Sequence, residues 1–296
     1  MTLLLTILIS TVTLSAPLIL AALGGLASER SGVINLALEG KMLTSACVTA
    51  LAAVALNNAF LGAVCGIGAA ILMSLLHWLL TQKFSLDHII SGMAINALAL
   101  GGTNFLDRAF TDHSRSGGIP ILPTAMLDLG DVGKFQVSAY LVLAFIAPLL
   151  TYWYLKCTRA GLRLFAVGGD PDKSRLMGVR PLRVRLWALV ATGIFTGLGG
   201  ALVISNVGRF TNDMTAGRGY IALAALILGG WRPLPALAAC VAFALFEAIQ
   251  IQLQGTDLFG ANIPSEAWQA LPYLVTVIAL AGLLGKSRAP QGLGKP

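Results

Sequence analysis

The chain has 296 residues, of which 56% are hydrophobic and only 11% are charged, and its mean hydropathy is +0.81. A soluble domain does not need so apolar a composition to fill its core, so the composition indicates an integral membrane protein without a separate soluble module. The formal net charge of +7 does not indicate nucleic-acid binding, because eight of the 20 Lys and Arg residues lie in one loop, residues 156–185.

Apolar segments recur along the whole chain at the length that a membrane-crossing helix needs, about 20 residues with a short limit of about 17. Eight segments meet that requirement: residues 3–23, 33–56, 61–80, 89–106, 137–155, 186–205, 235–253 and 269–284. A ninth, residues 218–230, is too short to cross comfortably, which favours a re-entrant or tilted half-helix. The chain is therefore predicted to be one all-α domain over residues 1–296, a polytopic transmembrane helical bundle of about eight to ten membrane segments. The connections at residues 107–136 and 255–268 are predicted to be turns and loops.

Positive charge collects in the loop at residues 156–185 and in the terminal stretch KSRAPQGLGKP, which is predicted to be a short disordered tail. Because cytoplasmic loops of membrane proteins carry the excess of Lys and Arg, both places are predicted to face the cytoplasm. An even number of crossings must then separate them. Two alternatives remain open: either residues 218–230 cross the membrane, or one of the longer spans is also re-entrant.

The basic loop contains the signals of a short helix. Asp170 is a residue type that caps helix N-termini, and Pro171 follows it at the first helical position, where proline is tolerated. Gly178 can end such a helix, and Pro181 follows it. These residues predict about two turns of helix lying along the membrane face. The alternative is an ordinary charged loop with a turn.

The sequence contains no catalytic, nucleotide-binding or metal-binding motif. GLLGKS at residues 282–287 lacks the first glycine of a phosphate-binding loop, because Leu280 stands at that position. The glycines within residues 197–200 are better explained by close packing of helices. The histidines are scattered, without acidic or cysteine partners at metal-ligand spacing. We therefore predict no catalytic residue, no metal and no directly bound cofactor.

Polar side chains inside the predicted spans need a reason, because a charge at the centre of a membrane helix costs about 2.5–3.5 kcal/mol on insertion scales. Four residues are candidates for lining a solute pathway: Asn96, Asn104, Glu247 and Gln250. Hydrogen bonding between helices is the alternative explanation for them. Glu39 is interpreted either as an interfacial carboxylate paired with Lys41 or another basic group, or as a group that lines a path or fixes helices around it.

Five segments, taken together, resemble one family of membrane proteins. They are ERSGVINLALEG (residues 29–40), SGMAINALALGGTNFL (91–106), GLRLFAVGGDPDKSRLMGV (161–179), MTAGRGYIALAALILGGWRPL (214–234) and LFEAIQIQLQ (245–254). They occur in the family's order and span most of the chain. The chain resembles the membrane permeases of ATP-binding-cassette importers for simple sugars and nucleosides, specifically the nucleoside branch. The fold that this resemblance implies is an all-helical permease of the ribose/branched-chain amino-acid permease type.

The resemblance implies a transport subunit, not an enzyme, that carries nucleosides or a related simple sugar or nucleobase inward by alternating access. ATP and Mg would bind in a separate ATP-binding-cassette subunit, which pushes on a coupling segment at residues 166–178 of this chain. The residues that would carry this role are Ala166, Gly168, Asp170, Pro171 and Gly178, the last four by shaping its turns. Further expected partners are a second, homologous permease in a heterodimer and an extracellular or periplasmic substrate-binding lipoprotein. The expected location is the cell (inner) membrane.

An ion-coupled secondary transporter of a small polar solute is the alternative function, although few intramembrane acids are available to bind a coupling cation. Uptake abolished by vanadate would favour the importer, whereas uptake abolished only by an uncoupler would favour the secondary transporter. An intramembrane enzyme is a third possibility, and it lacks a candidate catalytic carboxylate pair or metal site.

Overall fold

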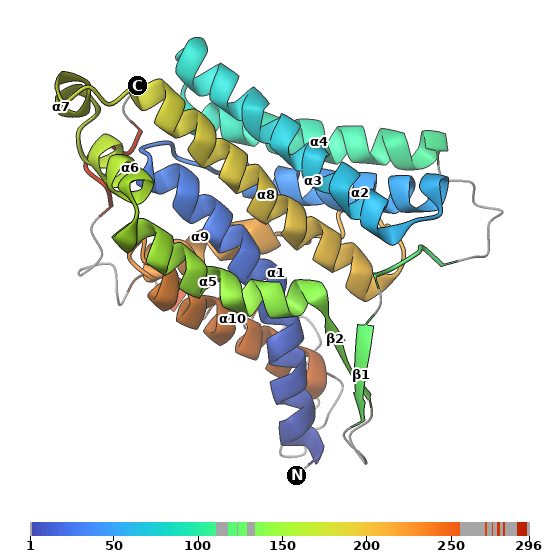
Figure 1. Cartoon of the computed structure of the whole chain (residues 1–296). Coiled ribbons are helices and arrows are strands. Elements are labelled where there is room, and N and C mark those ends of the chain that lie inside the picture. Colours follow the sequence, from blue (N-terminus) through green and yellow to red (C-terminus); the bar gives the residue numbers. More distant parts are fainter. Residues whose placement is uncertain are drawn as a thin grey trace.

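The computed structural model describes residues 2–110, 118–122, 124–128 and 134–254, together with residues 270, 274, 277, 278, 281 and 289–294. Seven helices of this described part are long and apolar enough to cross a membrane. They are α1 (Thr2–Arg30), α2 (Leu38–Leu56), α3 (Ala59–Trp78), α4 (His88–Phe110), α5 (Ala139–Cys157), α8 (Pro181–Val207) and α10 (Pro233–Leu253) (Figure 1). The shorter helical elements are the π-helical turn η1 (Leu79–Lys83), which continues α3, and α6 (Arg159–Gly169), α7 (Pro171–Leu176) and α9 (Arg218–Leu228).

The helices confirm the predicted all-α polytopic bundle, and seven of the eight predicted spans correspond to a long helix. The eighth, residues 269–284, lies largely outside the described residues. The ninth segment forms α9, whose 11 residues rise about 16 Å at 1.5 Å per residue, roughly half of the ~30 Å hydrocarbon core. The prediction for residues 33–37 was wrong, because they form an irregular segment and α2 begins only at Leu38.

A short antiparallel hairpin precedes α5, where only turns and loops were predicted. Strand β1 (Thr124–Asp128) pairs with β2 (Lys134–Ser138), and Thr124 lies opposite Ser138. The Ser138 side-chain oxygen also accepts a hydrogen bond from the backbone N–H of Leu141 at 3.2 Å, so this residue ends the strand and caps the helix. The span predicted to begin at residue 137 therefore begins at Ala139.

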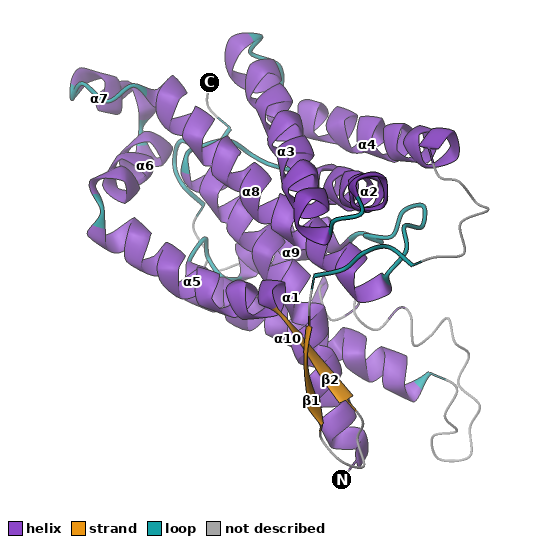
Figure 2. Ribbon diagram, turned by 45° about the vertical axis from the view of Figure 1, so that its right-hand side comes forward, coloured by secondary structure: helices purple, strands orange, loops and turns teal. Residues whose placement is uncertain are grey.

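Helix α1 runs through the middle of the bundle, against α5, α8, α9 and α10 (Figure 2). Residues 16–26 are apolar or small on every side of the helix, and all of them are buried. A helix that is hydrophobic all round is one that other helices enclose, which accounts for this central position. The hydroxyl of Thr192 in α8 donates a hydrogen bond to the carbonyl of Gly24 at 2.7 Å, so the two backbones approach closely here.

Glycines allow α8 to pack directly on α3. A Cβ atom on Gly193 would lie 2.6 Å from the Cα of Ile71, and one on Gly197 would lie 2.8 Å from the Cα of Ile67. Small residues spaced four apart bring membrane helices into backbone contact, where packing and hydrogen bonds hold them together. The packing explanation is thereby confirmed for Gly197, and Gly200 likewise abuts the backbone of α2 at Met42.

Candidate functional site

The predicted coupling segment, residues 166–178, covers the end of α6 and the whole of α7. Helix α6 begins after Thr158, whose hydroxyl accepts a hydrogen bond from the backbone N–H of Gly161 at 3.0 Å. Its buried residues recur at helical spacing: Gly161, Leu164, Val167 and Gly168. This spacing produces an amphipathic helix, with one face against the bundle and the other, which includes Ala166, exposed. The sequence prediction did not anticipate a separate helix at residues 159–169.

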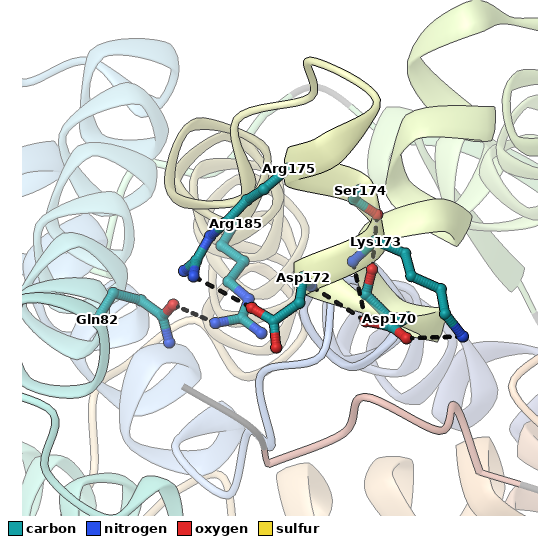
Figure 3. A network of polar contacts seen from close by, with 7 residues as sticks. All are labelled: Gln82, Asp170, Asp172, Lys173, Ser174, Arg175 and Arg185. Atoms are coloured by element: carbon teal, nitrogen blue, oxygen red, sulfur yellow. Dashed lines mark hydrogen bonds and ion pairs between the residues drawn. The ribbon is translucent and has the colours of Figure 1, made fainter.

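Helix α7 forms as the sequence predicts. The Asp170 carboxylate accepts hydrogen bonds from the backbone N–H groups of Asp172 and Lys173, each at 3.1 Å, and Pro171 occupies the first helical position (Figure 3). The bond from the Lys173 backbone is the main cause that lowers the pKa of Asp170 from its ordinary value. Gly178 has a φ of +80°, the left-handed conformation that terminates a helix without strain when the residue is glycine.

At Gly168 the coupling segment packs closely against the end of α1. The Cα of Gly168 faces the carbonyl oxygen of Arg30 so closely that no Cβ atom fits between them. The Arg30 guanidinium lies 4.7 Å from the ring centroid of Phe165, and its Nε donates to the carbonyl of Trp231 at 2.8 Å. Arg30 therefore joins α6, the end of α1 and the segment between α9 and α10.

Part of the stretch predicted to be a disordered tail also contributes to the contact between α6 and the end of α1. Residues 289–294 form turns, in which the N–H of Gly292 donates to the Gly168 carbonyl at 2.8 Å and the N–H of Gly294 donates to the Gly32 carbonyl at 2.9 Å. The disorder prediction was therefore wrong for these residues. Gly292 and Gly294 suit this contact, because a narrow gap between two backbones accepts small residues. We call residues 289–294 the C-terminal clasp.

Residues 31–37, the buried turn, join α1 to α2 without regular helix. Irregular backbone buried in a membrane protein must find hydrogen-bond partners within the protein. Three side chains from other helices supply them. The Nε of Arg185 donates to the Ser31 carbonyl at 3.2 Å, the N–H of Ile34 donates to His88 Nδ1 at 3.3 Å, and Asn96 Nδ2 donates to the Leu36 carbonyl at 2.9 Å.

Arg185 is a functional candidate that sequence reasoning missed. It counted only as part of the positive charge of the loop, yet its side chain is 1% exposed. Its Nη1 donates to Gln82 Oε1 in η1 at 2.7 Å, as Figure 3 shows. The available signal was its position on the face of α8 that also carries Ala188, Leu189 and Thr192, which are all buried. Spacing of three, four and seven residues puts Arg185 on the packed face rather than the exposed one.

Glu29, Asn35 and Lys41 form a buried polar chain beside the turn. Glu29 accepts a hydrogen bond from the Trp231 indole N–H and one from the Asn35 backbone N–H at 3.5 Å. The Lys41 ammonium lies 3.0 Å from Asn35 Oδ1 and 3.3 Å from His77 Nδ1, and Lys41 is fully buried. The proposed pairing of Glu39 with Lys41 was therefore wrong. A two-residue spacing places side chains on different sides of a helix.

Glu39 instead holds the N-terminus of α9. Its Oε1 accepts the backbone N–H of Gly217 at 2.8 Å, and its Oε2 accepts that of Gly219 at 2.6 Å. The first N–H groups of a helix have no partner within the helix and carry partial positive charge, so a carboxylate there is stabilising. The alternative interpretation of Glu39, as a group that fixes helices around it, fits this geometry.

Two of the four predicted pathway residues meet at the first turn of α9. Asn96 Oδ1 accepts the N–H of Gly40 at 2.8 Å, and its Nδ2 donates to the Tyr220 hydroxyl at 2.8 Å. Glu247 Oε1 forms an ion pair with Arg218 Nη2 at 3.1 Å, and both side chains are 20% exposed. Interhelical bonding thus accounts for the polar groups of Asn96. Contact with a solute remains a prediction for both.

The other two predicted pathway residues form no side-chain hydrogen bond with α9 among the described residues. Asn104 lies two turns further along α4, where its Oδ1 is buried and has no hydrogen-bond partner among the described residues. Gln250 is partly buried near the end of α10. A buried amide oxygen without a partner is unfavourable unless water or a ligand reaches it, so a solute contact at Asn104 also remains a prediction.

The chain matches the family model described as "Branched-chain amino acid transport system / permease component" over residues 7–280. It is 35% identical to the guanosine ABC transporter permease protein NupQ of Bacillus subtilis, over 97% of this chain and 94% of that protein. It is 32% identical to the nucleoside ABC transporter permease protein NupC of Lactococcus lactis, over 95% and 92% respectively. A solved inward-facing structure of an ABC transporter assigned to the metal-chelate type shares the fold, with a TM-score of 0.51 and 15% identity over 94% of this chain and 86% of that one.

Proposed function

Because the chain belongs to the family of permease components of branched-chain amino acid transport systems, it is the permease subunit of an ATP-binding-cassette importer, and we propose that its solute is a nucleoside. The similarity to two permeases named for guanosine and nucleosides, over more than nine-tenths of all three chains, carries this proposal. The subunit transports and is not an enzyme. We further propose that ATP and Mg bind in the partner ATPase rather than in this chain.

The coupling segment is where we propose that the ATPase docks. Leu176, the last residue of α7, and Met177, which follows it as the C-cap, are 89% and 81% exposed. Such apolar side chains at the tip of a two-helix projection would suit burial in a groove of a partner protein. The adjoining cap at Asp170 and the glycine at Gly178 fix the direction in which that tip projects.

The buried turn is the proposed route by which motion at α6 reaches the rest of the permease. Gly168 abuts the last residue of α1, and the buried turn follows directly. Asn96 then connects the turn to α4 and, through Tyr220, to α9. The first contact is close backbone packing and the later ones are hydrogen bonds, so a displacement of α6 would move the turn and the N-terminus of α9 together. Alternating access would follow if that movement opens the path on the other side.

The first turn of α9 is the proposed place of solute contact. Tyr220 is 46% exposed and offers an aromatic face on which a nucleobase could stack. The neighbouring Arg218–Glu247 pair and Asn96 offer donors and acceptors suited to ribose hydroxyls. Asn104 and Gln250 belong to the same proposed pathway at greater distance from α9.

We propose that the coupling segment and the C-terminal clasp both face the cytoplasm. The two hydrogen bonds of the clasp support a common side for them, because they tie it to Gly168 and Gly32. The expected partners are a second, homologous permease in a heterodimer and a substrate-binding lipoprotein on the opposite side of the membrane. Co-purification of two different permeases would support the heterodimer, and recovery of this permease alone in a functional complex would contradict it.

Uptake in a host without endogenous nucleoside transport tests the function. Cells that express the permease with its partner subunits should accumulate labelled guanosine, and excess nucleosides should compete while glucose should not. Vanadate, which traps ATP-binding-cassette subunits, should abolish uptake even when the membrane potential is intact. Uptake that survives vanadate but stops with an uncoupler would favour the ion-coupled secondary transporter. Competition by glucose alone would refute the proposal that the solute is a nucleoside.

A further inference from the structure

A large cleft in the described part of the molecule lies between α5 and α8, with α1 as its floor and α6 at one end. It has a volume of about 1000 Å³. Most of its wall consists of apolar side chains, such as Ile146 and Leu150 of α5 and Phe195 of α8. The four predicted pathway residues are absent from its lining. The cleft is therefore separate from the proposed solute route, and its mostly apolar wall does not suit a nucleoside.

Positive charge is found at only one end of this lining. Arg163 of α6 and Arg183 of α8 lie there, contributed by different walls. The ion pairs found among the described residues use other side chains, so no described carboxylate neutralises either guanidinium. Tyr154 and Trp187 line the same end and are 45% and 70% exposed. Aromatic and basic side chains together are typical of the headgroup level of a bilayer.

The length of the cleft matches the depth of one leaflet. Arg183 and Leu198 both line it, and α8 rises roughly 22 Å between them at 1.5 Å per residue. One leaflet, with its headgroup region included, is about 20–22 Å deep, half of a bilayer of about 40–45 Å. Acyl chains that begin at the arginines therefore have room along the whole apolar part. A concave, basic-rimmed cleft differs from an ordinary lipid-facing helix surface, because it can select the headgroup as well as solvate the chains.

We propose that this cleft binds one anionic phospholipid, with its acyl chains between α5 and α8 and its phosphate against Arg163 and Arg183. The planar guanidinium matches phosphate oxygens in geometry as well as in charge. The chain's own residues 269–284 would not neutralise these arginines, because that segment contains no carboxylate. The proposal rests on the proposed function in one respect: it places the lipid in the cytoplasmic leaflet because the coupling segment faces the cytoplasm.

The bound lipid connects two parts of the energy-coupling route. Arg163 and Leu164 of α6 and Arg183 of α8 flank α7 on either side in the sequence, and all three line the cleft. A lipid that contacts both helices holds α6 at a fixed position against α8. We therefore expect solute-stimulated ATP hydrolysis to need an anionic lipid, and to fall when only phosphatidylcholine is present.

The test uses the complete transporter in nanodiscs that contain phosphatidylcholine and phosphatidylglycerol. A photoactivatable phosphatidylglycerol, with its reactive group in the acyl chain, should label peptides of α5 and α8. The Arg163→Gln/Arg183→Gln variant should label about thirtyfold less, since each basic residue at a membrane surface contributes about a fivefold preference. The matched control, Arg159→Gln/Arg180→Gln, removes the same charge from the same loop outside the lining and should label like the parent. Ala191→Phe, which narrows the cleft and keeps both arginines, should also reduce labelling.

Three results would overturn the lipid site: equal loss in the two double variants, equal labelling by the matched phosphatidylcholine probe, or unchanged labelling in Ala191→Phe. Crosslinks that join the cleft to residues 269–284 or to a second permease would also overturn it, because another occupant would then fill the space. Guanosine uptake is measured on the same preparations. Selective labelling without uptake contradicts only the proposed function, and uptake without selective labelling contradicts only the lipid site.

Discussion

Replacing Gly168 with alanine places a side-chain carbon against the backbone at the end of α1. The added Cβ would lie 2.8 Å from the carbonyl carbon of Arg30 and closer still to its oxygen. Favourable contacts between heavy atoms lie at about 3.5–4.0 Å. Because the obstacle is main chain and cannot rotate away, α6 and the end of α1 must separate by about 1 Å.

The size of the expected effect follows from this overlap. Overpacking of a tightly packed site typically costs about 1–3 kcal/mol. If that cost falls on the docked position of α6, the occupancy of that position falls by about 5- to 150-fold. We therefore expect uptake by the Gly168→Ala variant to fall at least about fivefold. Its amount in the membrane should change little, because the substituted residue lies in α6, outside the membrane-spanning helices.

Gly169→Ala is the matched control. No atom lies within 4 Å of the position that its Cβ would take, and alanine is favoured over glycine in a helix by about 1 kcal/mol. Both variants are compared for labelled guanosine uptake and for ATP hydrolysis in proteoliposomes that contain the complete transporter. Equal uptake by the two variants would refute the argument that Gly168 is the mechanical contact between the coupling segment and α1.

Three further predictions concern charged groups. Because the pKa of Asp170 is lowered in the folded protein, its cap on α7 should be present at neutral pH and lost only as the pH falls through that lowered pKa. Asp170→Asn keeps an acceptor and should remove this acid-side loss from a profile of ATPase activity against pH, whereas Asp170→Ala should weaken coupling at every pH. Lys41→Met should lower the melting temperature of the purified permease, because Asn35 loses its buried donor at a cost of about 1–3 kcal/mol; an unchanged melting temperature would count against that role. Glu247→Gln should reduce uptake by leaving Arg218 unpaired, and the exchange Glu247→Arg with Arg218→Glu should restore it if the pair is structural; failure to restore would favour direct solute contact.

Local sequence signals predicted the elements whose causes are local. Hydropathy located seven described spans, since a membrane helix needs a long apolar run and little else. The start of α7 was predictable because Asp170 and Pro171 act on the adjacent turn, and its end was predictable from Gly178. These residues determine backbone geometry without help from distant parts of the chain.

Features that depend on distant partners were not predictable in the same way. The mostly apolar residues 33–37 were predicted to be helical, although hydrogen bonds with the side chains of Arg185, His88 and Asn96 allow an irregular turn there. For Glu39 the sequence left pairing with Lys41 and fixing of helices as alternatives, and its partners in the fold follow it by well over a hundred residues. For the pathway residues, side-chain type indicated that a partner was needed, but only the fold identified Tyr220 and Arg218 as the partners.

The C-terminal clasp also constrains the order in which the molecule can be completed. A ribosome releases Gly168 and Arg30 long before it reaches Gly292, so the Gly168 carbonyl lacks its final donor while most helices are already inserting. A nascent chain therefore cannot lock α6 onto the end of α1 until translation of the clasp is finished. An unfinished permease would therefore not yet present its ATPase with a coupling segment packed against the end of α1.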